Sequence, residues 1–207
     1  MTNKEKMLNE KLYNSNDKEL IKLSNRGRRL LTKFNKTNYT NFKKRSKLIK
    51  KIFNKTGKNI KVNPPIYLDY GSNITVGENF YSNYNLTILD VCEVIIGNNC
   101  MIGPNVSIYT ALHPIDPTIR NTSLEYGKKV IIKDNVWIGG NVVINPGVTI
   151  GNNVIIGSGS VVTKDISDDV IVFGNPAKIH RKITKEDYNY WKKEYDKYFE
   201  TIKWNSW

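Results

Sequence analysis

A six-residue period of β-branched residues is the feature that most constrains the fold of this chain. Between Val130 and Val162, Val or Ile recurs at every sixth position in two series that start two residues apart. The series are Ile132, Ile138, Ile144, Ile150, Ile156, Val162, and Val130, Val136, Val142, Val148, Val154, Ser160. A helix repeats at about 3.6 residues and a strand at about 2, so neither gives this period. Short strands joined by regular corners do, which predicts a parallel β-helix around one aliphatic column.

The residues between the ladder positions are suited to tight corners. Gly139, Gly151 and Gly157 are expected to supply backbone angles that other residues resist. Turn-forming pairs fill other corners: Asp134-Asn135, Pro146-Gly147 and Asn152-Asn153. An ordinary β-sandwich would show irregular strand spacing, and the regular period argues against it. The regular portion is long enough for roughly five coils of three hexads.

Breaks in the period divide the chain into three parts. Residues 1–58 are expected to form a helical N-terminal cap, in which Asp17 caps the second helix by accepting bonds from free amides. Residues 59–180 are expected to hold the coils, with an excursion at 109–129 that lacks the ladder. Residues 181–207 are expected to contain a C-terminal helix. Its aromatic stripe is typical of packing against its own core or a neighbouring subunit: Tyr188, Trp191, Tyr195, Tyr198 and Ile202.

The net charge of +13 is concentrated in the first part of the chain. Residues 1–60 hold 18 Lys and Arg against 4 Asp and Glu, whereas the remainder holds 14 against 15. A basic segment attracts polyanions. Because no nucleic-acid motif accompanies the charge, we interpret it as a solvated helical surface and expect no nucleic-acid partner.

Cysteine and hydropathy patterns favour a soluble cytoplasmic protein. Cys92 and Cys100 lie eight residues apart, which fits neither a metal pair nor a disulfide framework. Cys100 falls on the six-residue ladder and is expected to be a core residue. The N-terminus has no apolar run typical of a signal peptide, and no stretch approaches the roughly 18 apolar residues of a membrane span.

His113 is the best candidate for a general base. An imidazole can accept a proton near neutral pH, and His113 lies in the excursion rather than on the ladder. His180 follows the last strand and is expected to be a surface residue. With two histidines on different segments, a three-histidine zinc site within one chain is impossible, so we expect proton transfer without a metal. Asn83 and Asp90 are polar where the ladder favours aliphatic residues, which indicates a departure for function.

Several motifs together resemble the bacterial maltose/galactoside O-acetyltransferases, a branch of the hexapeptide acyltransferases. They are Thr110-Ala111-Leu112-His113-Pro114, Asn135-Val136-Trp137-Ile138-Gly139, Asn145-Pro146-Gly147-Val148-Thr149-Ile150-Gly151 and Gly174-Asn175-Pro176-Ala177-Lys178. The resemblance runs from about Met7 to Arg181. It implies a left-handed coil, a homotrimer with active sites between subunits, and acetyl-CoA as the donor in a groove between coils, with no metal.

The resemblance also implies roles for particular residues. His113 would take the proton from a hydroxyl of a maltose-, glucose- or galactoside-like sugar, which attacks the thioester directly. The Asn83 side chain would stabilise the transition state, and the backbone N–H of Gly140 would bind the acetyl thioester. The acceptor would contact Asp17, Asp69, Asn83 and Glu125. CoA would contact Gly140, Ser158, Thr163 and Lys164, with Lys178 and Arg181 on its phosphates, a role that suits two cations just beyond the last coil.

Three departures from that family leave the sugar open. Galactoside-acetylating members have an Asp-Asp pair where this chain has Asp90-Val91, a serine at the Asp69 position and an apolar residue at the Glu125 position. One alternative is a non-sugar acceptor, an amine or an antibiotic hydroxyl, and the N-terminal cap argues against it. Another is a non-catalytic basic protein that binds nucleic acid and no CoA, against which the set of His113 and the CoA-binding positions argues.

Overall fold

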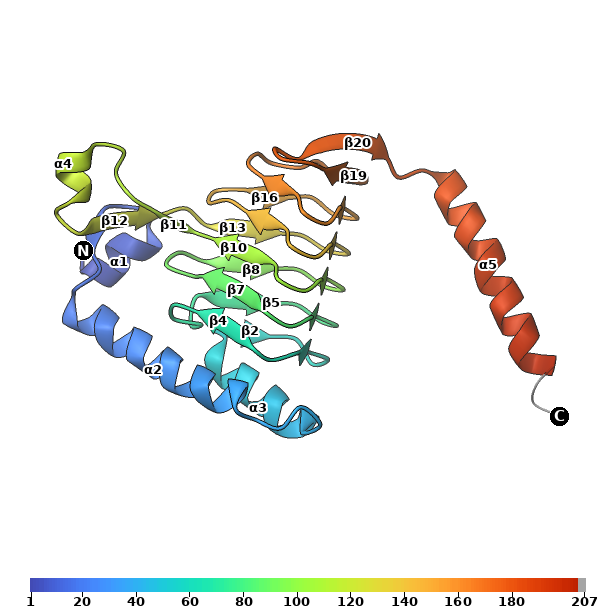
Figure 1. The fold of residues 1–207 in the computed structure, drawn as a ribbon, viewed down its shortest axis with the longest axis horizontal. Coiled ribbons are helices and arrows are strands. Elements are labelled where there is room, and N and C mark those ends of the chain that lie inside the picture. Colours follow the sequence, from blue (N-terminus) through green and yellow to red (C-terminus); the bar gives the residue numbers. More distant parts are fainter. Residues whose placement is uncertain (205–207) are drawn as a thin grey trace.

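The computed structural model describes the backbone of residues 1–204 and the side chains of residues 1–200. Figure 1 shows a stack of β-coils with helices of the N-terminal segment across one end, an excursion at the side, and a last helix that leaves from the other end. Three sheets form the sides of the stack, and each of five coils contributes one strand to each sheet. Pairing between coils is parallel, and the last strand of one sheet is added antiparallel. A partial sixth coil adds the bridge between Ile150 and Ile166 and a further strand.

The strands of each sheet are short, and the chain visits the three sheets in turn. Sheet one contains β2 (Lys55–Thr56), β5 (Ile74–Val76), β8 (Val94–Ile96), β13 (Val130–Ile132) and β16 (Thr149–Ile150). Sheet two contains β3 (Lys61–Val62), β6 (Tyr81–Ser82), β9 (Met101–Ile102), β14 (Trp137–Ile138), β17 (Ile155–Ile156), β19 (Val170–Phe173) and β20 (Lys178–Lys182). Sheet three contains β4 (Ile66–Leu68), β7 (Leu86–Leu89), β10 (Ser107–Tyr109), β15 (Val143–Ile144) and β18 (Val161–Val162).

The predicted ladder forms the interior of the stack. Ile138 pairs with Ile102 on one side and Ile156 on the other, so equivalent positions of successive coils lie directly above one another. Every residue of the two series between Val130 and Val162 is at most 2 % exposed. Cys100 is buried in the same column and is a free thiol, as expected from its place on the ladder.

Asparagine, rather than glycine, adopts the left-handed backbone angles at the first corner, between sheets one and two. Asn79, Asn99, Asn135 and Asn153 have φ values of 55–60°. Each side-chain Nδ2 donates to the side-chain oxygen of the next coil at 2.8–3.0 Å, and the column ends at Asp169. Asparagine tolerates this conformation, and the stacked amides link consecutive coils.

Glycine was expected at positions 139, 151 and 157 for its unusual backbone angles, and this reason is wrong. None of the three has a positive φ. A Cβ on Gly151 would lie 2.3 Å from Asp168 Oδ1, and one on Gly139 would lie 2.6 Å from the Ser158 backbone nitrogen. These positions lack a side chain because the next coil approaches too closely, not because of their backbone angles.

The N-terminal cap closes one end of the aliphatic column. It consists of α1 (Asn3–Leu8), β1 (Tyr13–Asn14), α2 (Lys18–Asn35) and α3 (Phe42–Ile52). Asp17 caps α2 as predicted, because its side chain accepts bonds from the backbone nitrogens of Glu19 and Leu20. The Asn35 side chain makes two bonds to the backbone of Ile66 in the first coil. Phe34 and other apolar residues of the cap join the buried column.

The excursion leaves at the third corner, between sheets three and one, and packs on the cap. It contains β11 (Ala111–Leu112), α4 (Pro117–Arg120) and β12 (Leu124–Gly127). β12 pairs antiparallel with β11 and with β1, so the small sheet joins the excursion to the N-terminal segment. The excursion is therefore an ordered platform at the side of the stack.

The chain ends in α5 (Lys185–Trp204), which lies apart from the coils in Figure 1. Arg181 in β20 donates two hydrogen bonds of 2.7 Å to the Asp187 carboxylate in the first turn of α5. The predicted aromatic stripe is on this helix, and Tyr188 and Trp191 are 63 % and 66 % exposed. The side chain of Ile202 lies outside the described residues. Among the helices of residues 1–204, none has the length and apolarity of a membrane span.

Candidate active site

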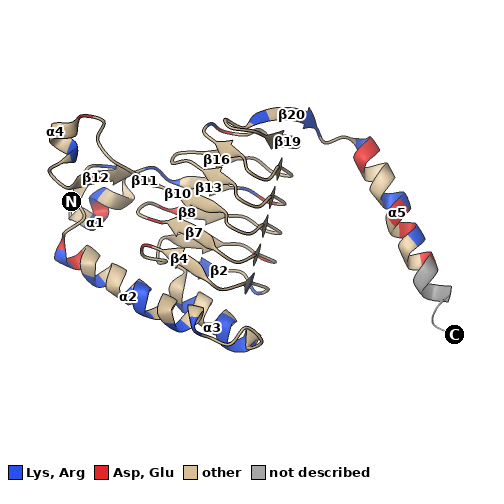
Figure 2. Ribbon diagram, in the orientation of Figure 1, with Lys and Arg blue, Asp and Glu red and all other residues tan. Residues whose placement is uncertain are grey.

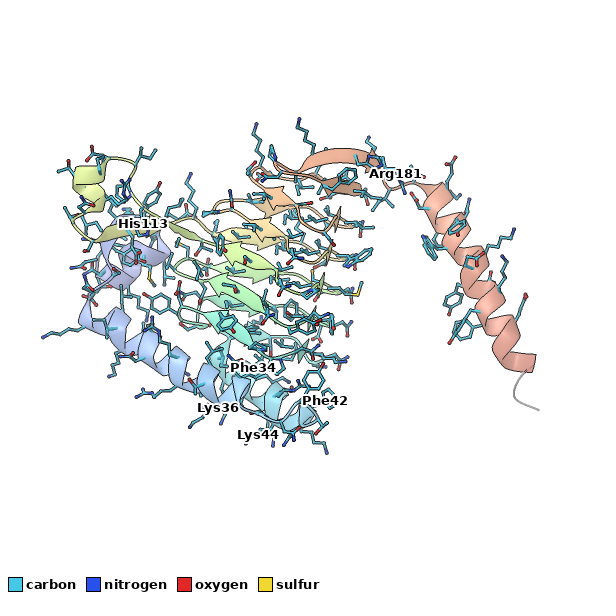
Figure 3. The ribbon with its side chains drawn as sticks, viewed as in Figure 1. Phe34, Lys36, Phe42, Lys44, His113 and Arg181 are labelled. Carbon is cyan, nitrogen blue, oxygen red and sulfur yellow. The ribbon has the colours of Figure 1, made fainter. Side chains whose placement is uncertain are left out.

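A cavity of about 350 Å³ lies at the third corner, where α2, the excursion and the loops after β4 and β7 meet. It brings together three of the predicted site residues, His113, Asp69 and Glu125, with Tyr70, Val91 and Arg28 among the other lining residues. Figure 3 shows His113 on the excursion, beside the cap. Within the described residues, no three His, Cys, Asp or Glu side chains are arranged to hold a metal ion.

Glu125 is the carboxylate nearest to the candidate base in the cavity. Its Oε2 lies 4.0 Å from His113 Nε2, and its Oε1 accepts a 2.7 Å hydrogen bond from the Tyr13 hydroxyl. β1 pairs with β12, which sets Tyr13 opposite Glu125. Burial raises the pKa of Tyr13, and its bond to Glu125 adds to the effect, so the phenol stays a donor. Glu125 is thus held in place while His113, 58 % exposed, faces solvent at the mouth.

Asp69 is positioned by a loop that Asp90 holds. Asp90 is fully buried, and its Oδ1 accepts from the backbone nitrogens of Asp69 and Tyr70 at 3.1 and 3.0 Å. Burial raises the pKa of Asp90 to about 7 in spite of these bonds. Burial also raises the pKa of Asp69, and the charge of Glu125 adds to this, whereas Arg28 acts in the opposite direction. Asp90 therefore fixes the loop that carries Asp69 and Tyr70 in the wall of the cavity.

Asp17 is not a lining residue of this cavity. Its carboxylate accepts bonds from the Asn3 side chain and from the first backbone nitrogens of α2, and these contacts lower its pKa. A contact between Asp17 and an acceptor stays a prediction.

A second group of predicted residues lies along the second corner, between sheets two and three. The register of Ser82, Ile102, Ile138 and Ile156 places Asn83, Gly140 and Ser158 along this one corner, in the second, fourth and fifth coils. Asn83 Oδ1 accepts from the Tyr84 backbone nitrogen, and within the described residues its Nδ2 has no acceptor. The Gly140 backbone N–H also has no acceptor there. The second corner thus presents two free hydrogen-bond donors.

Thr163 and Lys164 follow β18 on the third corner, two coils beyond the point where the excursion leaves. The predicted residues therefore occupy two corners on either side of sheet three. One chain does not bring Asn83 and His113 into the same cavity.

Lys178 and Arg181 both belong to β20, beyond the last full coil. Lys178 is exposed and makes no ion pair with any residue of the described part of the chain. Arg181 is already paired with Asp187, which any phosphate would have to displace or share. His180, on the same strand, is exposed as predicted, and its ring packs on Phe173 at 4.7 Å between centroids.

Sequence reasoning did not identify Tyr13 and Arg28 as site residues. Tyr13 contacts Glu125 across 112 positions of sequence, and neither residue lies in a local motif. One signal could have revealed Tyr13. It lies in a short extended segment between two helices, and such a segment can form a strand that pairs with the excursion.

Comparison with known proteins identifies both the cap and the coils. The model of the maltose acetyltransferase hexapeptide capping motif matches residues 6–57. The model of the bacterial transferase hexapeptide (six repeats) matches residues 129–164, and that of the hexapeptide repeat of succinyl-transferase matches residues 93–112. The galactoside O-acetyltransferase of Lactococcus lactis is 43 % identical over 180 residues, which cover 86 % of this chain and 87 % of the relative.

Solved structures agree with that match over almost their whole length. A maltose O-acetyltransferase from Clostridium difficile superposes with a TM-score of 0.88 at 51 % identity, covering 89 % of this chain and 98 % of the other. A galactoside acetyltransferase in complex with coenzyme A superposes with a TM-score of 0.87 at 43 % identity, covering 90 % and 94 %. The expected left-handed parallel β-helix is confirmed. This chain belongs to the maltose and galactoside O-acetyltransferase family of hexapeptide-repeat acetyltransferases.

Proposed function

We propose that this protein transfers the acetyl group of acetyl-CoA to a hydroxyl of a maltose-, glucose- or galactoside-like sugar. The observation that carries the proposal is His113 at the mouth of a cavity, beside the half-buried carboxylate of Glu125, in a chain whose relatives are galactoside and maltose O-acetyltransferases. The solved complex of a 43 % identical relative with coenzyme A supports the donor.

His113 acts as the general base. Its imidazole takes the proton of the sugar hydroxyl, and the hydroxyl oxygen attacks the thioester carbonyl carbon. The tetrahedral intermediate then expels the CoA thiolate, which receives the proton from the imidazolium, so that an acetyl ester and CoA thiol leave. Glu125, 4.0 Å from His113 Nε2, stabilises the imidazolium while it carries the proton. Asp69, Glu125 and Asn83 orient the acceptor hydroxyls, and Asp17 contributes from the start of α2.

The developing oxyanion needs hydrogen-bond donors that are already in place. The free Nδ2 of Asn83 and the free backbone N–H of Gly140 meet this requirement on the second corner. The pantetheine chain follows that corner past Ser158, with Thr163 and Lys164 on the facing corner. Lys178 and Arg181 bind the phosphates of CoA. The chemistry needs no metal ion.

The residues of the second corner and those of the third corner come together between two copies of the chain. Residues of the second corner and His113 on the third corner lie on either side of sheet three, so the second corner of one copy must face the third corner of the next. A contact between two different surfaces closes into a ring when the rotation is right. We assign a homotrimer to this ring, with three active sites between subunits and a cytoplasmic location that cell fractionation would check.

The two histidines provide a matched test of the mechanism. His113→Ala is expected to lower kcat by about 10²–10⁴-fold, the usual contribution of a general base. His180→Ala removes an exposed imidazole outside the cavity and is expected to leave turnover unchanged. The assay is thiol release from acetyl-CoA with a panel of sugars, together with CoA affinity by calorimetry. Near-normal turnover in His113→Ala with intact CoA binding would remove the proposed base.

A further inference from the structure

The helical cap carries a one-sided charge that the proposed reaction does not use. From residue 20 to residue 68 the chain holds 15 Lys and Arg and no Asp or Glu. Figure 2 shows these cations along α2 and α3, at the end of the stack opposite β20. Like charges at this density repel one another, and a bound anion would relieve that repulsion.

A cavity of about 730 Å³ lies within this region, between α2 and the end of α3. Five cations line it: Arg26, Arg29, Lys33, Lys50 and Lys51. Asp and Glu are absent from its lining, and within the described residues none of the five cations is in a salt bridge. One weak contact restrains them, from Arg26 Nη2 to the Lys51 carbonyl oxygen at 3.5 Å. The cavity thus presents several unneutralised charges on two facing walls.

The spacing of the charges suits an extended anion. Arg26, Arg29 and Lys33 recur at helical i, i+3, i+7 positions, so they form a row of about 10 Å along one side of α2. Lys50 and Lys51 stand in the last turn of α3 on the opposite wall. A chain of two or three phosphates has a comparable length, and guanidinium and ammonium groups form strong charge-assisted bonds with phosphate oxygens.

The interior of the cavity is apolar between these walls. Leu30 is half-buried and Phe53 is 4 % exposed, and both line the cavity. The volume lies in the range of small-molecule sites, and such sites combine apolar surface with a few placed charges. Phe53 is already covered by the core, whereas a phosphate chain alone would leave the half-buried Leu30 in contact with water. A flat ring attached to the phosphates would cover it.

We infer that this cavity, here called the cap site, binds a molecule that joins an oligophosphate to a flat aromatic ring, as a nucleoside triphosphate does. The cap site lies under the first coil, whereas Gly140 and Ser158 belong to the fourth and fifth coils. It is therefore separate from the proposed donor groove, and both can be filled at once.

Calorimetry with the full-length protein tests the cap site. CoA is left out, because it also joins phosphates to an adenine ring and would compete at the cap site. The donor groove is instead disabled in every sample by Lys178→Gln with Arg181→Gln, and ionic strength is constant. The probes are ATP, inorganic tripolyphosphate and adenosine. ATP is expected to bind saturably, tripolyphosphate about tenfold more weakly and adenosine not measurably, because the ring and the phosphates each contribute. Equal affinity for ATP and tripolyphosphate, or no saturable ATP binding, would overturn the inference.

Two double variants with the same change of charge separate a built site from diffuse attraction. Arg29→Gln with Lys50→Gln removes one cation from each wall and is expected to weaken ATP binding by about tenfold or more. Lys36→Gln with Lys44→Gln removes two exposed cations of the cap that do not line the cavity, labelled in Figure 3, and is expected to change it less than about twofold. Equal losses in both variants would show general electrostatic attraction and refute the cap site. Thermal unfolding verifies that both variants fold.

Discussion

Glu125 connects the candidate base to the N-terminal segment through two oxygens with different partners. Oε1 is held by the Tyr13 hydroxyl, and Oε2 lies 4.0 Å from His113 Nε2. At the scale of single residues, the cavity therefore pairs the proposed base with a carboxylate that the Tyr13 hydroxyl holds in place.

Replacing Glu125 by Gln tests this partnership. The amide keeps a bond with Tyr13 but carries no charge, so the imidazolium loses stabilisation. We expect kcat to fall by about tenfold, a modest effect because His113 is largely exposed and solvent screens the pair. Steady-state kinetics with acetyl-CoA and the best sugar measure it, with CoA KM as the internal control. An unchanged kcat would mean that Glu125 contacts the acceptor alone.

The raised pKa of Asp90 predicts how the free energy of unfolding depends on pH. Its pKa of about 7 lies above that of an unfolded aspartate, about 4, so the folded state keeps a proton that the unfolded state loses between these values. The free energy of unfolding should therefore fall as pH rises through this window, by up to about 4 kcal/mol, and level off above it. Urea unfolding at several pH values measures the slope. Asp90→Asn should remove that part of it, whereas the exposed control Glu93→Gln should retain it.

At the scale of the elements, each corner of the coil has its own chemical requirement. The first corner has left-handed angles at asparagine and, in four of the five coils, a glycine where the next coil approaches closely. Lys133 takes the equivalent place in the fourth coil. At the second corner Asn85, Asn105 and Asn141 have positive φ, and Gly159 takes the equivalent place in the fifth coil. Glycine therefore occurs at the corners for two different reasons: one position has no room for a side chain, and another has a left-handed backbone angle.

Two glycine substitutions separate these demands. In Gly151→Ala the new Cβ meets the Asp168 backbone nitrogen at 2.6 Å, and we expect a loss of stability of about 1–3 kcal/mol or more. In Gly159→Asn no atom lies within 4 Å of the Cβ position, and asparagine accepts the φ of 74°, so we expect a change of less than about 0.5 kcal/mol. Urea denaturation compares the two variants. Similar costs at both positions would contradict this division.

The coils and the cap could be predicted from sequence because their signals are local and repeated. The six-residue ladder fixed which side chains face inward, and Asp17 before α2 is a typical helix cap. The roles of corner residues could not be predicted as well, because the reason for Gly151 is an atom of the next coil. Tyr13 was missed for a related reason, since its partner lies in the excursion and no pattern within either segment specifies the pairing.

At the scale of the whole molecule, the separation of Asn83 and His113 on two corners makes the assembly part of the proposed chemistry. If each site takes His113 from one copy and Asn83 from the next, a chain that lacks either residue is inactive alone. A mixture of the two defective chains can still form complete sites, because a copy with His113 can stand beside a copy with Asn83.

Subunit mixing therefore tests the shared site. We expect His113→Ala and Asn83→Ala chains, refolded together in equal amounts, to regain about a quarter of the wild-type activity, since one interface in four combines both intact residues at random. Each variant refolded alone is the control. Activity no higher than the sum of those controls, when an affinity tag on one variant co-purifies the untagged other and so shows mixed rings, would mean that the site does not need both chains.

The excursion interrupts the coils without altering their register. Val94 and Val130 are direct partners although 36 residues separate equivalent positions at this step, against 18 or 20 at the neighbouring steps. The stacking of the coils is therefore the same whether the insertion is long or short. An insertion at this corner can therefore change in length and sequence while the coils before and after it keep their pairing.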